Sequence, residues 1–507
     1  MWWSRLVALG LILVMTGCQT RAPHTPPSRS QLNAEETLSR SLAHYSRGIV
    51  ATRSRPQDHV AAARHFEAAL SHQPDSWRIA KRLVRSYKKL ERHEDSQELL
   101  ERICQAEPDN MEAFLALARS YQDTGNHAAA VTNARTAIHL SPTNAEAHLR
   151  LLRSLISTKD YPGVLDAIDA AAANTTHTDI ILTFAHNIGR GFAKDNRHEF
   201  AAKCFARVLH HDPDNLDCLK DLRNALSALK RLKDEITAQQ RIVELSDDIQ
   251  QKLFLGTLLE EAERYDEALL IYEPLLTSDS RTPDLISRVA RAYLSNENTT
   301  KSVAVLTTGI EAFPENPSLL ALRAMAWTMQ ADYLKAIADY EDAEELLLNS
   351  EIFSVTPSFY YSYGAVCERA GKFELAEKLL LRCIDMEPKA HHARNYLAYM
   401  WAENGHKLEE AYTQVTRALK DDPENGAYLD TLGWILFQQR EFQKALPKLL
   451  QAGKLMPGDP IITEHIGDCY RALDNPAEAL TWWNQSLKIA PDNVKLREKI
   501  DSIIVED

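Results

Sequence analysis

Apolar and polar residues alternate along this chain in amphipathic runs, and prolines close many of the runs. In two stretches the closing prolines stand 34 residues apart. These prolines are Pro74, Pro108, Pro142, Pro423, Pro457 and Pro491. A fixed period of about 34 residues predicts helix–turn–helix units, each of which buries its apolar face only against its neighbours in the chain.

Several positions of this period keep a constant character when the closing proline is taken as position 32. Position 20 is small and position 11 is usually aromatic. Position 8 is also small, and it holds Ala118, Gly256, Ala290, Ala324, Gly364, Ala398, Gly433 and Gly467. Position 24 is large and apolar, with Phe66, Leu100, Phe205, Tyr272, Tyr340, Leu449 and Trp483. We expect the small positions to mark where the two helices of a unit meet.

This pattern resembles the tetratricopeptide repeat, which implies an all-α, right-handed superhelical solenoid of about thirteen helix–turn–helix repeats. Gly125, Gly371 and Gly405 fall at the turn between helices, where a left-handed residue favours glycine. Gly433 falls inside a helix, where glycine costs about 1 kcal/mol relative to alanine. We interpret it as a packing glycine that lets the second helix approach the first.

Departures from the pattern predict the domain boundaries. We expect a signal peptide at 1–18, a Pro-rich tether at 19–34, a first repeat array at 35–345, an intervening segment at 346–356, a second array at 357–493 and a capping helix at 494–507. The sixth repeat has an uncertain register, because Arg223 and Glu235 stand where small residues belong. A polar-faced helix after Pro491 would close the open end of the solenoid.

The first 18 residues have the form of a secretory signal. Arg5 precedes a ten-residue apolar run from Leu6 to Met15, which is too short to span a bilayer. The run ends in M-T-G-C, which resembles a bacterial lipobox, so we expect Cys18 to be lipidated and to anchor the protein. By resemblance to bacterial lipoproteins, Gln19 after the cysteine favours the periplasmic face of the outer membrane. The alternative is a plain signal peptide with an incidental cysteine.

Composition and motifs narrow the function. The 58 Lys and Arg against 71 Asp and Glu give a net charge of −13, which argues against a nucleic-acid partner. The chain lacks zinc-protease, phosphate-loop, nucleophile-elbow and paired-cysteine motifs, so we expect no enzyme activity, no cofactor and no metal site. Cys367 and Cys383 could approach each other within one repeat, either as a disulfide or as buried small apolar residues.

In a tetratricopeptide superhelix the first helix of each repeat lines the concave face, so its positions 2, 5, 9 and 12 predict a protein-binding groove. The basic candidates are Arg85, Arg119, Arg153, Arg190 and Arg291. The aromatic and acidic candidates are Tyr399, Asp430, Trp434, Phe437 and Asp468. Arginines could hold an acidic or extended peptide, and an aromatic cluster could form a binding hot spot.

Each half of this groove has a simpler interpretation. The arginines could be solvated or paired with neighbouring carboxylates, which adds little stability at an exposed site. Trp434 could be partly buried against the adjacent repeat.

Three stretches resemble a narrower group of bacterial tetratricopeptide lipoproteins. They are N-Y-L-A-Y-M-W-A-E-N-G from Asn395, A-Y-L-D-T-L-G-W from Ala427 and E-H-I-G-D from Glu464. That group includes an adaptor for a periplasmic carboxyl-terminal processing protease whose clients are cell-wall hydrolases. The resemblance implies a membrane-anchored scaffold that brings such an enzyme and its protein substrates together. The alternative is a structural subunit of an outer-membrane machine for polysaccharide export, pilus biogenesis or outer-membrane protein assembly.

Overall fold

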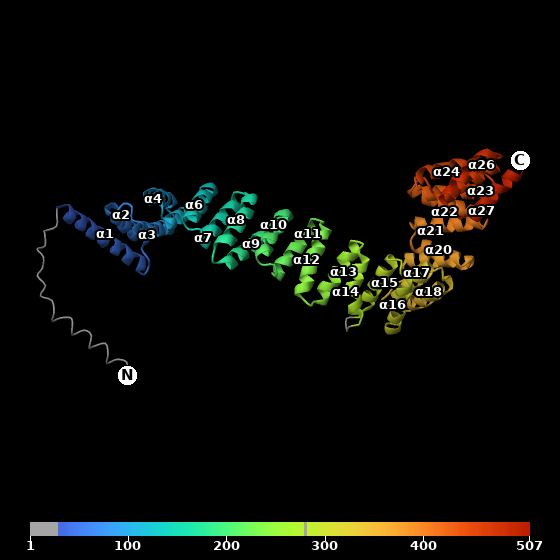
Figure 1. Cartoon of the computed structure of the whole chain (residues 1–507), viewed down its shortest axis with the longest axis horizontal. Coiled ribbons are helices and arrows are strands. Elements are labelled where there is room, and N and C mark those ends of the chain that lie inside the picture. Colours follow the sequence, from blue (N-terminus) through green and yellow to red (C-terminus); the bar gives the residue numbers. More distant parts are fainter. Residues whose placement is uncertain (1–28, 278–280, 507) are drawn as a thin grey trace, which may run out of the picture. The chain divides into compact units, whose positions relative to one another are not determined.

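The computed structural model describes residues 29–277 and 281–506, and these residues are almost entirely helical (Figure 1). Twenty-seven α-helices follow one another as hairpins, and these two ranges contain no strand. Thirteen hairpins and one closing helix match the predicted repeats, so the expected all-α repeat fold is confirmed. None of the helices in the described ranges combines the length and the apolar character that crossing a bilayer requires.

The chain forms two compact units, and the first ends at Ser246. Its helices are α1 (Arg29–Arg53), α2 (His59–His72), α3 (Trp77–Lys89), α4 (His93–Ala106), α5 (Met111–Asp123), α6 (His127–Leu140), α7 (Ala145–Ser157), α8 (Tyr161–Asn174), α9 (Thr178–Lys194), α10 (His198–His211), α11 (Leu216–Ala228) and α12 (Leu232–Leu245).

The second unit begins at Asp247. Its first helices are α13 (Ile249–Glu261), α14 (Tyr265–Tyr272), the 3-10 helix η1 (Glu273–Thr277), α15 (Pro283–Ser295), α16 (Thr299–Ala312), α17 (Pro317–Met329) and α18 (Tyr333–Leu348). The remaining helices are α19 (Pro357–Arg369), α20 (Phe373–Met386), α21 (His391–Glu403), α22 (Leu408–Asp421), α23 (Gly426–Gln438), α24 (Phe442–Leu455), α25 (Pro460–Ala472), α26 (Pro476–Ile489) and α27 (Val494–Glu506).

Two observed boundaries differ from the predicted ones. Helix α1 begins at Arg29, so the last six residues of the predicted 19–34 tether are helical. The boundary between the compact units falls after Ser246, and residues 349–356 connect α18 to α19 inside the second unit. The core continues across that connection, because the Tyr340 ring stacks on Tyr363 at 5.2 Å and meets Phe359 edge-on at 5.5 Å. The predicted signal peptide, Cys18 and most of the tether lie outside the described residues.

The turn inside each hairpin from α3–α4 onward contains a left-handed residue, as the sequence predicts, and the α21–α22 turn contains a second, Lys407, with φ of 49°. Gly125, Gly371 and Gly405 have φ angles of +81°, +74° and +57°. In the other hairpins from α3–α4 onward, residues with side chains occupy the same turn with φ between 56° and 63°. They are Glu91, Lys159, Asn196, Lys230, Glu263, Glu297, Ala331, Arg440 and Asp474.

Gly433 is a packing glycine, as predicted. A Cβ atom built on it would lie 2.6 Å from Cγ and Cδ2 of Leu449 and 3.2 Å from the Leu449 backbone nitrogen. Gly433 belongs to α23 and Leu449 to α24, so this contact brings the two helices of one hairpin together. Positions 8 and 24 of the repeat therefore meet. The same relation joins Gly467 to Trp483 and Gly256 to Tyr272.

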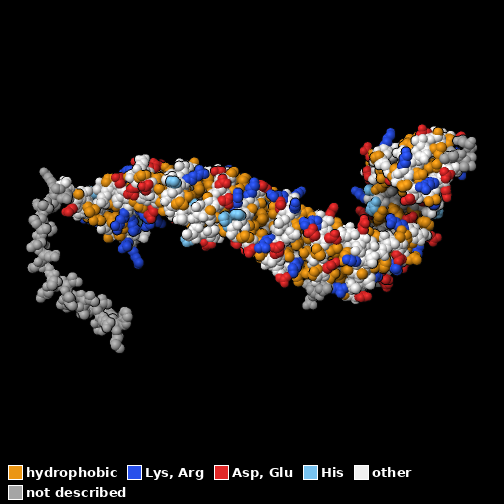
Figure 2. Space-filling view, in the orientation of Figure 1, with side chains coloured by type: hydrophobic (Ala, Val, Ile, Leu, Met, Phe, Trp, Pro, Cys, Tyr) orange, Lys and Arg blue, Asp and Glu red, His pale blue; other side chains and the backbone are white. Residues whose placement is uncertain are grey.

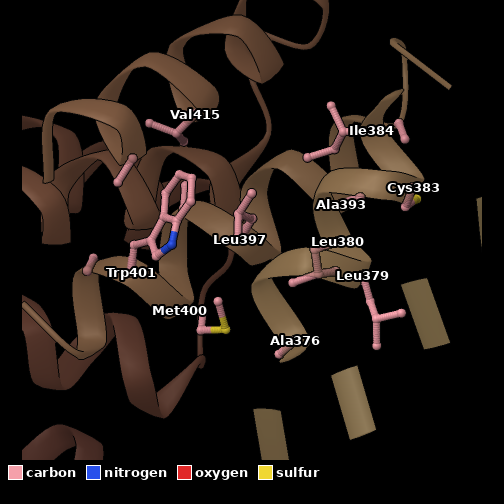
Figure 3. Packing of buried hydrophobic residues seen from close by; sticks show 14 of the residues in the cluster. Ala376, Leu379, Leu380, Cys383, Ile384, Ala393, Leu397, Met400, Trp401 and Val415 are labelled. Carbon is pink, nitrogen blue, oxygen red and sulfur yellow. The ribbon is translucent and has the colours of Figure 1, made fainter. Parts of the chain in front are cut away.

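Buried apolar side chains run from one hairpin into the next. Figure 3 shows one such region, where Leu379 and Leu380 of α20, Leu397 and Trp401 of α21 and Val415 of α22 belong to a single cluster. Trp401 is 5% exposed, and its Nε1 donates a hydrogen bond to Glu377 at 3.0 Å. This burial stabilises each hairpin mainly through its neighbours.

The sixth hairpin, α11–α12, whose register was uncertain from the sequence, has helices of 13 and 14 residues like the hairpin α5–α6, despite its polar substitutions. Arg223 donates a hydrogen bond to Oε1 of Gln239 at 3.0 Å, and Glu235 is buried beside them. Burial lowers the pKa of Arg223, and the negative charge of Glu235 opposes that shift. A buried polar group is tolerated when it is hydrogen-bonded, so a polar cluster replaces the small-residue contact here.

Candidate functional site

The first unit contains a groove of about 960 Å³, called the basic groove below. Its lining comes mainly from the first helices of three successive hairpins, α3, α5 and α7, with residues from the α1–α2 connection at one end. The Lys and Arg residues of the lining are Arg53, Lys81, Arg82, Arg85, Lys88, Lys89, Arg119 and Arg150. Figure 2 shows blue side chains gathered over α3.

Acidic residues of the groove are already engaged. Glu112 of α5 accepts a hydrogen bond from Nε1 of Trp77 at 2.9 Å and forms an ion pair with Lys81. The Lys81 hydrogen bond and then the Trp77 hydrogen bond lower the pKa of Glu112, so it remains a carboxylate. Asp123 pairs with Lys88.

The third acidic residue, Glu146, accepts a bond from Arg150 at 2.8 Å. Glu112, Asp123 and Glu146 are therefore each occupied by a cation of the lining itself.

Five cations of the lining remain without an ion pair to any residue in the described ranges. They are Arg53, Arg82, Arg85, Lys89 and Arg119. Arg85 and Arg119 are exposed and occupy the same position in consecutive repeats. The structure thus brings these two predicted residues into one groove. Neither forms an ion pair with a described residue, although the charge of Arg85 acts on Glu112, so of the two simpler interpretations the solvated one fits them and the paired one does not.

The other predicted arginines are placed differently. The guanidinium carbon of Arg153 lies 5.3 Å from the centroid of the Phe184 ring. Arg190 donates from Nε to Oδ2 of Asp221 at 2.5 Å, and Nε2 of His186 is 2.8 Å from the same oxygen. Neither arginine lines the basic groove.

In the second unit, Arg291 lines a separate groove of about 430 Å³ between α15, α17 and α19. Its Nε donates to its own helix, at the Ser287 carbonyl, at 3.3 Å.

Trp434 lies at the centre of an aromatic stack in the second unit, made of Phe437, Trp434 and His465. The Trp434 and Phe437 rings are 4.7 Å apart and inclined by 6°, and the Trp434 and His465 rings are 4.0 Å apart and inclined by 12°. His465 comes from α25, the first helix of the next repeat. Trp434 is half-buried, so the structure supports its interpretation as a side chain packed on the adjacent repeat, with one part still accessible.

Asp430 is buried and contacts His465 of this stack, so it does not face solvent. It is 6% exposed, and its Oδ1 is 3.0 Å from Nδ1 of His465, which is also 6% exposed. Burial alone would lower the pKa of His465. The hydrogen bond to Asp430 and the negative charges of Asp430, Asp468 and Glu403 outweigh burial, so the pKa lies above its usual 6.5. The pair couples α23 to α25.

Asp468 is held by the closing helix. Nζ of Lys499 in α27 donates to Oδ1 and Oδ2 of Asp468 at 2.8 and 2.7 Å, and Nε1 of Trp483 donates to Oδ1 at 3.0 Å. Lys499 also reaches Glu464 at 2.7 Å. Burial raises the pKa of Asp468, and the charge of Lys499 opposes that shift. The two predicted acidic residues, Asp430 and Asp468, therefore both bond to other side chains of the chain.

Tyr399 is half-buried beside this region. Burial, followed by the charges of Glu403 and Asp430, raises the pKa of its phenol. It therefore stays a neutral hydrogen-bonding group throughout the physiological pH range.

Sequence reasoning missed His465, Lys499 and Arg82. His465 and Lys499 carry weak signals, because each lies 35 or 31 residues after its carboxylate, close to one repeat length. Arg82 lies three residues before Arg85 on α3, which is less than one helical turn. A search for opposite charges about one repeat apart would have found the first two.

The described cysteines are all free and buried: Cys104, Cys204, Cys218, Cys367, Cys383 and Cys469. Burial raises the pKa of the Cys367 thiol to about 12, which leaves it protonated and unreactive. Cys367 and Cys383 therefore act as small apolar core residues. No cluster of His, Cys, Asp and Glu in the described ranges is arranged to hold a metal ion.

Comparison with known families matches two profiles, both described as "Tetratricopeptide repeat". One covers residues 56–121. The other covers residues 115–177, 289–347, 368–426, 406–460 and 431–494. Together these ranges include more than half of the chain.

Individual relatives are distant. The chain is 22% identical to human "DnaJ homolog subfamily C member 3" over 322 residues, which span 60% of this chain and 58% of that protein. It is 26% identical to "Type IV pilus assembly protein PilF" of Pseudomonas aeruginosa over 133 residues, 26% of this chain and 52% of PilF. Each alignment thus spans less than two thirds of the relative.

Among solved structures, the "Crystal structure of APC/C hetero-tetramer Cut9-Hcn1" aligns with 93% of this chain and 97% of that one. The sequence identity is 14% and the TM-score is 0.40.

Proposed function

The chain belongs to the tetratricopeptide repeat family, and from that membership we propose that it is a lipid-anchored adaptor at the periplasmic face of an outer membrane. In this role it binds an envelope enzyme, a protease by resemblance, and the protein substrates of that enzyme, such as cell-wall hydrolases. Cys18 carries the lipid. Anchoring raises the local concentration of both partners, so modest affinities suffice.

The basic groove is the observation that carries this proposal. It is concave and is lined by the first helices of three repeats. Five of its cations have no ion pair with the described residues. Cations without an ion pair on a concave surface can bind an anionic group of a partner molecule. Proteins of this family bind other proteins or peptides.

A second, chemically different surface supports a role that joins two partners. The aromatic stack of Trp434, Phe437 and His465 presents a half-buried indole in the second unit. Interface hot spots favour Trp and Arg anchors. The motifs from Asn395, Ala427 and Glu464, which resemble those of the adaptor lipoproteins, include Trp434 and His465.

The test is an affinity pull-down from detergent-solubilised envelopes with the full chain. We expect the wild type to recover a periplasmic protease or a cell-wall hydrolase. The double variant Arg85→Glu/Arg119→Glu should lose one partner, and Trp434→Ala should lose the other. The matched control is Arg135→Glu, an exposed arginine on α6 that does not line the groove. Recovery of neither enzyme class by the wild type would refute the adaptor function.

The same preparation tests the anchor. A Cys18→Ser variant should leave the membrane fraction and incorporate no labelled fatty acid. Retention in the membrane fraction without lipid would exclude lipidation at this cysteine.

The alternative function is a structural subunit of an outer-membrane export or assembly machine. The similarity to PilF, named as a type IV pilus assembly protein, favours it over 133 residues. In that case the pull-down should recover stoichiometric pore or assembly components, and neither groove variant should change the recovery.

A further inference from the structure

We propose that two copies of this chain associate as a two-fold symmetric dimer through a groove between α18 and α20 in the second unit. This groove, called the dimer groove below, has a volume of about 400 Å³. It is lined by the second helices of two consecutive hairpins, whereas the basic groove is lined mainly by first helices. The proposal concerns how the chain assembles, so it goes beyond the proposed adaptor function and does not depend on it.

The dimer groove lies where the repeat pattern is interrupted. Helix α18 has 16 residues, whereas α20, α22 and α24 have 14 each. Residues 349–356 connect α18 to α19, twice as many as residues 387–390, which connect α20 to α21. The last residue of α18, Leu348, belongs to the groove lining. The longer helix and the longer connection therefore give this pair of hairpins a surface that the regular repeats do not share.

The two walls of the dimer groove carry opposite charges. The acidic wall, on α18, consists of Glu341, Glu344 and Glu345, and the basic wall, on α20, consists of Lys378 and Arg382. Within each wall the charged residues are three or four positions apart, so they share one face of their helix. No lysine or arginine stands between Lys335 and Arg369 to offset the acidic wall.

Each wall keeps a charge that has no partner within the chain. One ion pair already crosses the groove: Nη1 of Arg382 donates to Oε1 of Glu344 at 2.6 Å, and the hydroxyl of Tyr360 donates to the same oxygen at 3.0 Å. Glu345 and Lys378 are both exposed, and neither forms an ion pair with a described residue. One unpaired carboxylate and one unpaired ammonium group thus line opposite sides of the groove.

Apolar side chains lie between and beside the charged walls. Leu379 is 1% exposed and belongs to the core, and Leu375 packs against that core. Leu348 is 65% exposed, and Ile352 in the connection after it is 88% exposed. An apolar centre with charged residues around it is the usual composition of a protein interface. A molecule seated in the groove would cover Leu348.

The arrangement of the charges selects a second copy of the chain as that molecule. A two-fold axis that runs along the groove places the acidic wall of each copy opposite the basic wall of the other, so the same favourable contact forms twice. Glu345 of each copy then faces a basic wall, and Lys378 of each copy faces an acidic wall. An axis across the groove would place like charges together, which is unfavourable. A different protein would need its own matching pair of walls, whereas a second copy matches by symmetry.

We expect this dimer to be weak in solution. A contact centred on one groove is small beside the roughly 1,600 Å² that a stable interface buries. Chains anchored to the same membrane have a high local concentration, which favours a weak contact. That consequence rests on the proposed lipid at Cys18, whereas the measurement in solution does not.

Sedimentation equilibrium of the purified full chain in a density-matched detergent measures the association. We expect a monomer–dimer equilibrium with a dissociation constant in the micromolar range. Raising the salt concentration should shift it towards monomer, because salt screens exposed charges. A chain that stays monomeric at every concentration would overturn the proposal, and so would a dimer that salt does not weaken.

Two variants locate the interface. Glu345→Lys and Lys378→Glu each place like charges opposite one another, twice in every dimer, so each should weaken self-association at least about tenfold. Mixed in equal amounts, the two variants should form a heterodimer of nearly wild-type affinity, because each supplies the charge that the other lacks. Circular dichroism should show that both stay folded, since the substituted side chains are exposed.

The matched controls make the same charge changes on α22. They are Glu410→Lys and Lys420→Glu, at exposed residues outside the groove lining, and each should leave association within about twofold of wild type. Equal weakening by the controls would show an effect of net charge alone. A mixture that associates no better than either variant would exclude the two-fold arrangement.

A different occupant would also be recognised. A monomeric wild type whose Lys378→Glu variant loses a protein in the envelope pull-down would assign the groove to that protein and overturn the dimer. Loss of self-association and loss of an envelope enzyme are separate measurements, so failure of the dimer leaves the adaptor proposal to its own test.

Discussion

Gly433 and Trp434 are neighbours in α23 with opposite requirements for space. Gly433 faces Leu449 of its own hairpin, where a Cβ would lie 2.6 Å from Leu449 Cγ. Trp434 points to the next repeat and stacks on His465. Adjacent residues of a helix point about 100° apart, so one can serve the contact within a hairpin and the other the contact between hairpins.

Replacing Gly433 by alanine should destabilise the C-terminal repeats by about 1–3 kcal/mol, because the methyl group would overpack the contact with Leu449. Urea unfolding followed by tryptophan fluorescence measures this loss. Gly191→Ala on α9 is the matched control, since no atom lies within 4 Å of the added methyl group. Alanine there should be neutral or stabilising by up to about 1 kcal/mol through helix propensity. A Gly433→Ala protein as stable as the control would contradict the packing argument.

His465 and Asp430 should make the stability of the last repeats depend on pH. The pKa of His465 in the folded chain lies above 6.5, its ordinary value. The protonated histidine therefore stabilises the fold fully below pH 6.5, and this contribution is lost as the pH rises through the folded pKa. We expect the unfolding midpoint of these repeats to fall from pH 6 towards more alkaline pH.

Asp430→Asn should abolish most of that pH dependence, because it removes the charge that raises the pKa of His465. Unfolding measured across this pH range by the fluorescence of Trp434, which stacks on His465, would show it. An unchanged pH profile in Asp430→Asn would assign the dependence to other groups.

Sequence reasoning at this scale identified where side chains fall within a repeat but missed how they pair. Position 9 placed Arg85 and Arg119 on helices that line one groove. Positions 5 and 9 placed Asp430 and Asp468 among exposed binding residues, whereas both are bonded internally. Each pairing depends on a partner from another helix, His465 or Lys499, and on the rotamers that packing selects. A periodic pattern contains neither.

At the scale of elements, the hairpin turns and the closing helix were both predictable. Proline spacing and small residues at position 8 fix where helices end and meet. The start of α1 was not predictable, because polar residues after Arg29 carry no apolar period that marks a helix. The closing helix α27 was recognised by its polar face, and the structure shows what its buried side contacts: Leu496 and Ile500 pack with Trp483.

Lys499→Met should destabilise the last hairpin by about 1–2 kcal/mol, because Asp468 and Glu464 would lose their shared cation while partly buried. Hydrogen exchange of α25, α26 and α27 measures the effect locally. Lys495→Met on the same helix is the control, since that lysine is exposed and has no ion pair with the described residues. Equal exchange rates in the two variants would show that α27 caps through its apolar side alone.

At the scale of the whole molecule, each unit is held together by local packing. In the described ranges, helices with extensive mutual contacts are neighbours or next neighbours in the chain. Such an array has no long-range contact whose loss unfolds everything at once. This explains why the period alone predicted the fold, because the helix ends, the turns and the contacts between helices all repeat about every 34 residues. The division after Ser246 does not follow from the period, because the hairpins on either side of it have similar lengths.

The left-handed turns have a consequence for how this chain can change over generations. Of the twelve turns from α3–α4 onward, nine have a residue with a side chain at the left-handed position, which glycine adopts without strain. Each such side chain costs on the order of 1 kcal/mol. Any of these positions can mutate to glycine and stabilise its hairpin without touching the inner helices. Glycine substitutions at these turns could therefore offset the loss of stability caused by mutations in the grooves. New specificities can then evolve one repeat at a time.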